Sequence, residues 1–317
     1  MTGRVLITGG AGFIGSHVAD AYLAAGYDVT ILDNLSSGRE SNVPRGARFV
    51  KGDIGSPDAR TLLATGGFTH LNHHAAQIDV RISVSDPLLD ARVNILGLLN
   101  LLEGARAGKV KRVVFASSGG VVYGDSDRLP HKEGAAKLPV SGYGVSKLTS
   151  EHYLAVYHGL YGLEVVSLRY ANVYGPRQNT EGEAGVVAIF GSRLRKGQSV
   201  TVFGDGSQTR DYVFVKDLAR ANVLASSSAL PPLRTIDSVA FNVGTGKETS
   251  VNDLVATMLK ASGITVPVKF APARAGELAR SAVDPQRIGR EWGWKPEVDL
   301  TTGLAETYRW IAAQEAA

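Results

Sequence analysis

The chain has 317 residues, of which 44% are apolar and 20% are charged, a composition typical of one large globular domain or two closely joined ones. No apolar stretch approaches the roughly 18 residues that span a bilayer, and the opening MTGRVLITGG lacks the pattern of a signal peptide. The absence of cysteine excludes disulfides, a thiol nucleophile and thiolate metal sites. We therefore expect a cytoplasmic protein with no membrane partner.

The net charge of +4 would suit either a phosphate-bearing small molecule or a nucleic acid. The basic clusters at 108–112 and 193–197 are short and contain no aromatic residues. Nucleic-acid surfaces combine extended basic patches with aromatic side chains that stack on bases. We interpret both clusters as solvated helix ends and expect no nucleic-acid partner.

Strand-like and helix-like segments alternate along the first half of the chain. Long helical patterns begin near residues 13, 87 and 143, and apolar, strand-like runs lie at 4–8, 28–33, 47–54, 69–76, 112–118 and 164–170. Strands that are buried on both faces and alternate with helices indicate a parallel sheet with right-handed crossovers. The expected fold class is α/β, a doubly wound (Rossmann-type) sheet with a smaller α/β substrate-binding lobe.

The alternation loosens after about residue 171, where longer loops separate shorter elements. We expect residues 1–171 to form the dinucleotide-binding domain, with a strand and helix contributed from about 211–245. Residues 172–210 and 246–317 are expected to form the substrate lobe. Trp292 and Trp294 are interpreted as core aromatics of that lobe.

A glycine-rich turn follows the first predicted strand, with Gly9, Gly12 and Gly15 in GGAGFIG. Glycines let a pyrophosphate approach the backbone, and the start of the next helix offers free N–H groups to it. Asp33 ends the second strand, where a carboxylate accepts hydrogen bonds from a ribose and repels a 2′-phosphate. The pattern predicts NAD rather than NADP. Asp53, at the end of the third strand, is either a helix N-cap or an adenine contact.

Tyr143 and Lys147 are four residues apart on a predicted helix, so their side chains share one face. A phenol titrates near pH 10, but a neighbouring ammonium and an oxidised nicotinamide both favour the phenolate. Tyr143 is therefore the predicted base for a hydroxyl proton. Ser118, at the carboxyl end of the fifth strand, is predicted to bind the substrate oxygen, and Ser117 to support the site or share that role.

These motifs resemble the extended short-chain dehydrogenase/reductase family, and within it the UDP-glucose (UDP-galactose) 4-epimerases. The resemblance covers essentially the whole chain. Beyond GGAGFIGSH it includes the blocks LDNLSSG (32–38), HHAAQ (73–77), VNILG (93–97), YGVSK (143–147), LRYANVYGPRQ (168–178) and RDYVFVKD (210–217). It implies an NAD-dependent isomerase that interconverts UDP-glucose and UDP-galactose through a transient 4-keto sugar, with Ser118, Tyr143 and Lys147 as catalytic residues.

The resemblance also implies the ligand contacts. The NAD-lining positions are Gly9, Gly12, Phe13, Ile14, Gly15, Asp33, Asn34, Ser37, Gly38, Asp53, Ile54, His74, Ala75, Ala76, Gln77, Asn94, Ser117, Tyr143, Lys147 and Tyr170. The positions that match the UDP-sugar anchor are Ser118, Asn172, Val186, Val187, Arg210, Arg274, Glu277 and Ser281. Ser281 falls where some relatives carry a bulky tyrosine, so we expect room for an N-acetyl group and activity on UDP-GlcNAc and UDP-GalNAc.

Two glycines follow Ser118 in SSGGVVYG. Relatives that dehydrate or decarboxylate the sugar place an acid here, because elimination needs a proton donor and acceptor at the adjacent carbon. Gly119 and Gly120 can do neither, which favours epimerisation. The segment has one more residue than in the commonest epimerases, so the hydroxyl falls on Ser118 when counted from the strand and on Gly119 when counted back from Tyr123.

Several alternatives remain open. One is a 4-epimerase of another nucleotide sugar such as UDP-glucuronate, which Glu181 and Glu183 beside the expected pocket disfavour. A nucleotide-sugar dehydratase or decarboxylase and a non-catalytic NAD-sensing regulator are the others. His70, His73 and His74 lie on one predicted strand, where neighbours point to opposite faces, so no metal site is expected. The helices near 87–107 and 143–162 resemble a family dimer interface, which predicts a homodimer.

Overall fold

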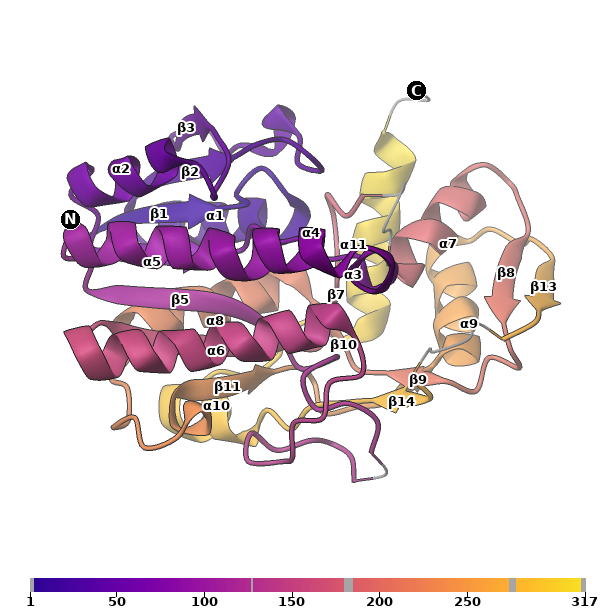
Figure 1. Ribbon diagram of the computed structural model, residues 1–317. Helices are drawn as coiled ribbons and strands as arrows, with labels where there is room; N and C mark the ends of the chain where they lie inside the picture. Colours follow the sequence, from indigo (N-terminus) through magenta and orange to yellow (C-terminus); the bar gives the residue numbers. More distant parts are fainter. Residues whose placement is uncertain (1–2, 127, 180–184, 274–277, 315–317) are drawn as a thin grey trace.

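The computed structural model describes residues 3–126, 128–179, 185–273 and 278–314. Within this part of the chain, parallel strands form a seven-stranded sheet in the order β11-β6-β5-β4-β1-β2-β3 (Figure 1). The strands are β1 (Arg4–Thr8), β2 (Asp28–Asp33), β3 (Arg48–Lys51), β4 (His70–His73), β5 (Arg112–Ser118), β6 (Glu164–Tyr170) and β11 (Ala240–Val243). The expected doubly wound α/β fold is confirmed.

Helices cover both faces of this sheet because its strands carry apolar side chains on both sides. Helices α2 (Pro57–Thr65), α5 (Gly97–Ala107) and α6 (Gly142–Tyr161) contribute Leu63, Leu101 and Leu154 to one core cluster. Helices α1 (Phe13–Ala24) and α8 (Val215–Ser227) pack on the opposite face, around Tyr22 and Ala219. No helix in the described ranges has both the length and the apolarity that crossing a membrane requires.

The predicted strands at 4–8, 28–33, 112–118 and 164–170 match β1, β2, β5 and β6 residue for residue. The predicted helix at 87–107 is present without a break, but it is not α-helical throughout. It consists of α4 (Pro87–Ala91), a π-helical turn (Arg92–Leu96) and α5, and a further helix, α3 (Val80–Ser85), precedes it. Such π-turns are frequent at functional sites, and Asn94 lies within this one.

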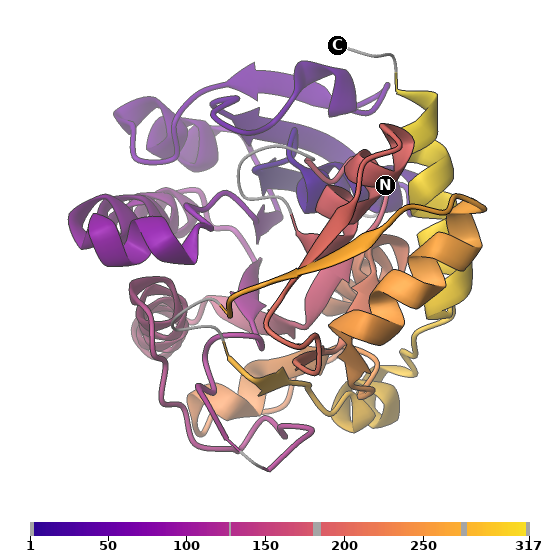
Figure 2. The ribbon, with the colours of Figure 1, turned by 90° about the vertical axis from the view of Figure 1, so that its right-hand side faces the viewer.

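Much of the second half of the chain packs at the carboxyl ends of the main strands (Figures 1 and 2). A separate apolar cluster there is built around Tyr174, Phe190, Leu254 and Leu304. Its elements are β7 (Asn172–Tyr174), α7 (Val186–Arg195), β8 (Val200–Phe203), β10 (Tyr212–Phe214), α9 (Val251–Ser262), β13 (Val268–Ala271) and α11 (Leu300–Ala313). Short strands β9 (Thr209–Arg210), β12 (Thr249–Ser250) and β14 (Arg280–Ser281) form a small sheet beside it.

The interpretation of the two tryptophans needs a correction. Helix α10 (Gln286–Trp292) lies against β11, and the rings of Trp292 and Phe241 are 3.9 Å apart. Trp294 is buried in the same cluster and donates a hydrogen bond to the Asp217 carbonyl at 2.9 Å. Both tryptophans therefore extend the core of the main sheet and not that of the smaller cluster, because the chain returns to the sheet after residue 281.

Candidate active site

The glycine turn after β1 is sterically obligatory. Gly9 has a φ of +70°, and a Cβ there would lie 2.6 Å from the Ala75 backbone nitrogen. A Cβ on Gly15 would overlap the Gly9 carbonyl oxygen, and one on Gly38 would lie 2.9 Å from the carbonyl carbon of Ala11. Helix α1 then begins after Gly12 without a side-chain cap, so its first N–H groups are left for a ligand.

A cavity of about 940 Å³ opens at this turn. Five of the predicted NAD positions line it, namely Gly12, Phe13, Ser37, Ala76 and Gln77. It also contains basic residues that sequence reasoning missed, Arg39, Arg177 and Arg195. Arg177 lies within the GPRQ segment (175–178) and pairs with Asp20 at 2.8 Å, a contact across 157 residues that no local pattern reveals.

Asp33 is held in place at the end of β2. Its carboxylate accepts hydrogen bonds from the Ala11 N–H at 3.0 Å and the Leu35 N–H at 2.8 Å. It is 7% exposed. Because each carboxylate oxygen has two lone pairs, one remains on each oxygen for a ribose hydroxyl. The position is the one expected for a dinucleotide ribose.

Asp53 is not a helix N-cap. Ser56 caps α2, whereas the Asp53 carboxylate accepts hydrogen bonds from the Asn34 side chain at 2.9 Å and the Gly55 N–H at 2.8 Å. The structure therefore excludes the N-cap role and leaves the adenine contact as the remaining prediction for Asp53. It also shows a hydrogen bond between two predicted NAD residues, Asn34 and Asp53. Ile54 is buried in the core against Gly97. Ile14 is partly buried between core clusters, so neither side chain is among the cavity-lining groups.

Gln77 and Asn94 form one network with a buried acid that sequence reasoning missed. The Gln77 N–H donates to Asn94 Oδ1 at 3.0 Å, and both side-chain amides donate to Asp90 Oδ1. Ser146 on α6 donates to the other Asp90 oxygen at 2.5 Å. Asp90 thus ties the cavity wall to the helix that carries Tyr143.

His70 and His73 on β4, and His74 directly after it, each contact a side chain or carbonyl of another segment. His73 shares a 2.6 Å hydrogen bond with Thr8, and His70 one of 3.2 Å with the Ser226 carbonyl. His74 stacks on Tyr170 with ring centroids 6.1 Å apart, and burial lowers its pKa to about 3. Within the described residues, no group of three or more histidine or acidic side chains is arranged to hold a metal ion.

Tyr143 and Lys147 lie near the start of α6, which Ser141 caps. The Lys147 ammonium lies 5.6 Å from the centre of the Tyr143 ring and donates to the Ala116 carbonyl at 2.7 Å. Burial lowers the pKa of Lys147 to about 8, while the charges of Asp90 and Glu151 act in the opposite direction. Burial and Asp90 raise the pKa of Tyr143, so the protein alone does not produce the expected lowering.

The two serines at the end of β5 have different surroundings. Ser117 is 2% exposed and donates to Glu151 Oε1 at 2.6 Å. Ser118 is partly exposed. A Cβ placed on Gly120 would lie 3.8 Å from Ser118 Oγ and 3.9 Å from Asn172 Oδ1, so these three positions face one space. Ser117 is therefore buried in a hydrogen bond to α6, whereas Ser118 borders this space.

A second cavity, of about 210 Å³, brings together Asn172, Val186 and Arg210 from the predicted substrate set. Phe203 and Tyr212 line it as well, and sequence reasoning did not single them out. Val187, by contrast, is buried in the cluster around Phe190, so its side chain is directed into the core.

Ser281 is 6% exposed and pairs with Arg210 in the β14–β9 ladder, so it is adjacent to this cavity. The remaining predicted positions, Arg274, Glu277, Glu181 and Glu183, lie outside the described residues.

A parallel α/β sheet, a glycine turn at a helix start, and a Ser–Tyr–Lys group at the carboxyl edge define a dinucleotide-dependent enzyme of the Rossmann class. Residues 5–244 match the profile described as the NAD dependent epimerase/dehydratase family. The chain belongs to this family, and NAD is its cofactor.

Related proteins match along nearly the whole chain. The UDP-glucose 4-epimerase of Mycolicibacterium smegmatis is 45% identical over 96% of this chain and 97% of its own. The crystal structure of Thermotoga maritima UDP-glucose 4-epimerase with UDP-glucose superposes with a TM-score of 0.92, at 41% identity over 97% and 98% of the two chains. A UDP-N-acetylglucosamine 4-epimerase from Methanobrevibacter ruminantium, bound to UDP-N-acetylmuramic acid, has a TM-score of 0.90 at 35% identity, with 98% of each chain covered.

Proposed function

We propose that this protein is an NAD-dependent UDP-glucose/UDP-galactose 4-epimerase, which inverts the C4 configuration through a transient 4-keto sugar. The observation that carries the proposal is the space shared by Ser118, Gly120 and Asn172 at the carboxyl end of β5, the strand to which Lys147, one turn after Tyr143 on α6, is hydrogen-bonded. Gly119 and Gly120 supply no acid or base at this point of the chain. Hydrogen removal and return at one carbon needs no such group, whereas elimination does.

The residues present fit NAD. The turn at Gly9 and Gly15 has no room for a side chain, the start of α1 carries no side-chain cap, and Asp33 keeps lone pairs for a ribose. When bound, NAD supplies a hydride acceptor and donor and, when oxidised, a positive charge. The proposed NAD contacts are Phe13, Ser37, Ala76 and Gln77 from the large cavity wall, with Asn34, Asp53 and Asn94 behind them.

In the proposed reaction, Tyr143 takes the proton of the sugar 4-hydroxyl and later returns it. Lys147 in its ammonium form stabilises the phenolate, offsetting the effect of burial and of Asp90 on the pKa of Tyr143. Ser118 hydrogen-bonds the reacting oxygen and holds it toward Tyr143. Because both hydrogen transfers occur at the same carbon, the sugar must present its two faces in turn.

Firm anchoring of the nucleotide would allow this rotation. We assign the nucleotide to the 210 Å³ cavity, where Arg210 supplies a cation, Asn172 an amide and Phe203 an aromatic face. Arg274 and Glu277 are kept as proposed contacts. In this proposal residues 172–210 and 246–317 form the substrate lobe, apart from α10 and Trp294, which pack on the main sheet, and residues 1–171 with part of 211–245 form the NAD domain.

The decisive experiment is to incubate the purified protein with UDP-galactose without added cofactor and follow UDP-glucose by chromatography. Conversion supports the epimerase. A 4-keto-6-deoxy product would indicate a dehydratase, and a carboxylate-bearing sugar turned over in preference would indicate another 4-epimerase. NAD binding without any turnover would indicate a regulator.

Substrate breadth is a further part of the proposal. Ser281 beside Arg210 is small, and the Methanobrevibacter ruminantium relative is a UDP-N-acetylglucosamine 4-epimerase. We therefore propose activity on UDP-GlcNAc and UDP-GalNAc. The proposal fails if UDP-galactose is converted and UDP-GalNAc is not.

We also propose a homodimer, formed through the predicted helices near 87–107, which begins with α4, and 143–162, which corresponds to α6. Apolar side chains on these helices are exposed, including Leu88 at 75%, Leu160 at 68% and Val156 at 50%. Such patches are rarely left open to water. The cytoplasmic location expected from the sequence stays a prediction, which fractionation of the host cells would test.

A further inference from the structure

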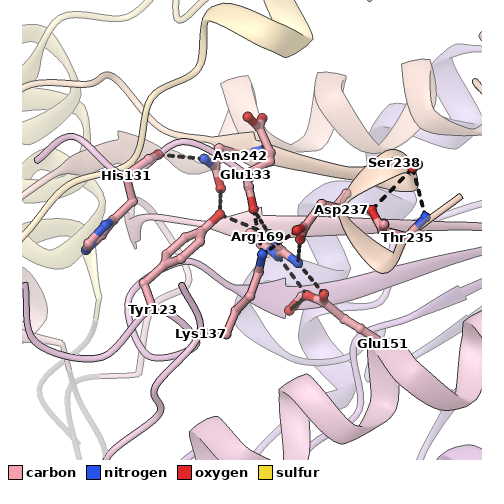
Figure 3. Close-up of polar contacts among 12 residues, drawn as sticks. Tyr123, His131, Glu133, Lys137, Glu151, Arg169, Thr235, Asp237, Ser238 and Asn242 are labelled. Carbon is pink, nitrogen blue, oxygen red and sulfur yellow. Dashed lines mark hydrogen bonds and ion pairs between the residues drawn. The ribbon is translucent and has the colours of Figure 1, made fainter. Parts of the chain in front are cut away.

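An ion pair is buried beneath the end of β5. The side chains of Arg169 on β6 and Glu151 on α6 are 0% and 1% exposed. They meet in a two-pronged contact, with Nη2–Oε2 at 2.6 Å and Nε–Oε1 at 3.0 Å (Figure 3). Removing two charges from water costs several kcal/mol per ion, so a buried pair of this kind is weak evidence for stability alone.

Arg169 uses its remaining donors to join other segments of the chain. It donates to Asp237 at 2.8 Å, to the Tyr123 hydroxyl at 3.1 Å and to the Glu133 carbonyl at 2.9 Å. Tyr123 in turn donates to Asn242 on β11 at 2.7 Å. Figure 3 shows the guanidinium at the centre of these groups. Tyr123 and Glu133 belong to the segment that follows Ser118 in the chain, and Asp237 belongs to the 3-10 helix Ile236–Val239 before β11.

The pair is also connected to the residues next to the proposed catalytic ones. Ser117 donates to Glu151, and Ser117 is the residue paired with Arg169 in the β5–β6 register. Glu151 is one helical turn after Lys147, which itself holds the Ala116 carbonyl. Three successive residues of β5 therefore have three different tasks: Ala116 binds Lys147, Ser117 binds Glu151, and Ser118 faces the site.

The charge of Glu151 matters to Lys147. The groups that face Lys147 are Asp90 from α4, His73 from β4, His74 directly after that strand, and Tyr143 and Glu151 from its own helix. Burial keeps both histidines neutral at pH 7. Asp90 and Glu151 are thus the groups whose negative charge favours the ammonium, and Arg169 balances one of them.

We infer that Glu151 and Arg169 are positioning residues for the epimerase reaction: together they fix the end of β5 beneath Ser118 and set the charge balance around Lys147. The inference rests on the proposed function, because it assigns the pair to that same site. Neither residue touches substrate or cofactor. Their effect is transmitted through Ser117 and Lys147.

The test compares three variants, Glu151→Gln, Arg169→Met and the double variant, by the pH dependence of kcat with UDP-galactose. Glu151→Gln removes a negative charge near Lys147 and leaves Arg169 with only its ion pair to Asp237 among the described residues, so the alkaline limb of the kcat profile moves to lower pH by about one unit or more. Arg169→Met does the opposite. The double variant restores the local net charge, so the alkaline limb of its kcat profile returns toward the pH seen in the wild type.

We expect kcat of Glu151→Gln at neutral pH to fall roughly 10- to 100-fold with little change in KM, because misplacing a reacting group is costly. The double variant controls for misfolding of the single variants. It removes the buried cation along with its buried partner, so neither charge of the pair is left without the other.

A matched control exists at the other end of the same two strands. Arg112 on β5 pairs with Glu164 on β6 at 2.7 Å, with its side chain 7% exposed. Arg112→Met is expected to lower Tm and leave the alkaline limb unchanged. If the alkaline limb of the kcat–pH profile lies at the same pH in all variants as in the wild type, and only Tm differs, the Arg169–Glu151 pair is merely structural and the inference is wrong.

A readout without turnover separates this inference from the proposed function. The difference in Tm between each background and the same background with Lys147→Met, measured against pH, reports the titration of Lys147. If the wild type converts no UDP-sugar, the proposed function fails. The Tm measurements then still test the inference. If the pair controls the charge of Lys147, the pKa of Lys147 is lowest in Glu151→Gln and highest in Arg169→Met.

Discussion

Lys147 on α6 and Ala116 on β5 are joined by a 2.7 Å hydrogen bond from the ammonium to the carbonyl oxygen. This bond attaches the helix of Tyr143 to the strand that ends in Ser118. It also fixes the ammonium in a place where burial lowers its pKa to about 8. The same side chain therefore contributes geometry and a titratable charge.

The pH dependence of the reaction follows from this pKa. Above about pH 8 the ammonium of Lys147 is lost and no longer favours the phenolate of Tyr143. We expect kcat to decrease above this pH, measured with UDP-galactose in buffers of constant ionic strength. A profile that is flat to pH 10 would contradict the assignment.

The pH dependence of stability has the opposite direction. Because the pKa of Lys147 is lower in the folded protein than in the unfolded chain, the unfolded state binds more protons between about pH 8 and the usual lysine value of 10.5. The buried ammonium therefore destabilises the folded state fully below about pH 8, and this destabilisation disappears as the pH rises from about 8 to 10.5. Lys147→Met should therefore raise Tm at pH 7 and abolish turnover, with a gain in Tm that shrinks toward pH 10.

The two serines at the end of β5 give a matched pair of variants. Ser118→Ala should lower kcat strongly while leaving Tm unchanged, because Ser118 is partly exposed and faces the site. Ser117→Ala removes a buried hydrogen bond to Glu151 and should cost about 1–3 kcal/mol in free energy of unfolding. Circular dichroism melts and initial rates distinguish them. Equal loss of kcat with no change in stability would mean that the serines share the role.

The two glycines after Ser118 are expected to differ in how a substitution affects stability. A Cβ on Gly119 would lie 2.6 Å from Cγ1 of the fully buried Val283, so Gly119→Ala should cost about 1–3 kcal/mol in stability. A Cβ on Gly120 meets nothing closer than 3.8 Å, and Gly120→Ala should fold like the wild type. Denaturant titrations test this, and similar midpoints for both variants would contradict it.

The proposed dimer can be tested at Leu160, which is 68% exposed on α6. Leu160→Glu should give a monomer in sedimentation velocity, because a charge on an apolar contact surface is costly to bury. Phe270→Glu is the control, since Phe270 is 61% exposed on β13, away from α4 and α6. A wild-type monomer, or a Leu160→Glu dimer, would refute this interface.

The sequence was most informative where one residue type solves a local problem. Gly9 and Gly15 were predicted from a pattern that depends on backbone geometry, and β5 from an apolar run buried on both faces, so its bounds are exact. The positions of Tyr143 and Lys147 follow from helical spacing. These features depend on neighbours in the chain.

What the sequence did not reveal depends on distant contacts. Asp90 and Glu151 appear as ordinary helical acids until Ser146 and Ser117 are brought to them across 56 and 34 residues. The N-cap reading of Asp53 was wrong because Ser56, three residues on, satisfies the start of α2. The tryptophans were assigned to the wrong core because nothing local shows that the chain returns to β11.

The edge of the main sheet next to β6 is supplied by β11, some 70 residues later in the chain. Asp237 and Asn242, which complete the surroundings of Arg169 and Tyr123, come from that late segment too. During synthesis, the nucleotide-binding half therefore leaves the ribosome with an open hydrogen-bonding edge, and Arg169 beside it has Glu151 as a partner but still lacks Asp237. A polypeptide cut after residue 171 would keep every dinucleotide motif and yet be an incomplete, association-prone sheet.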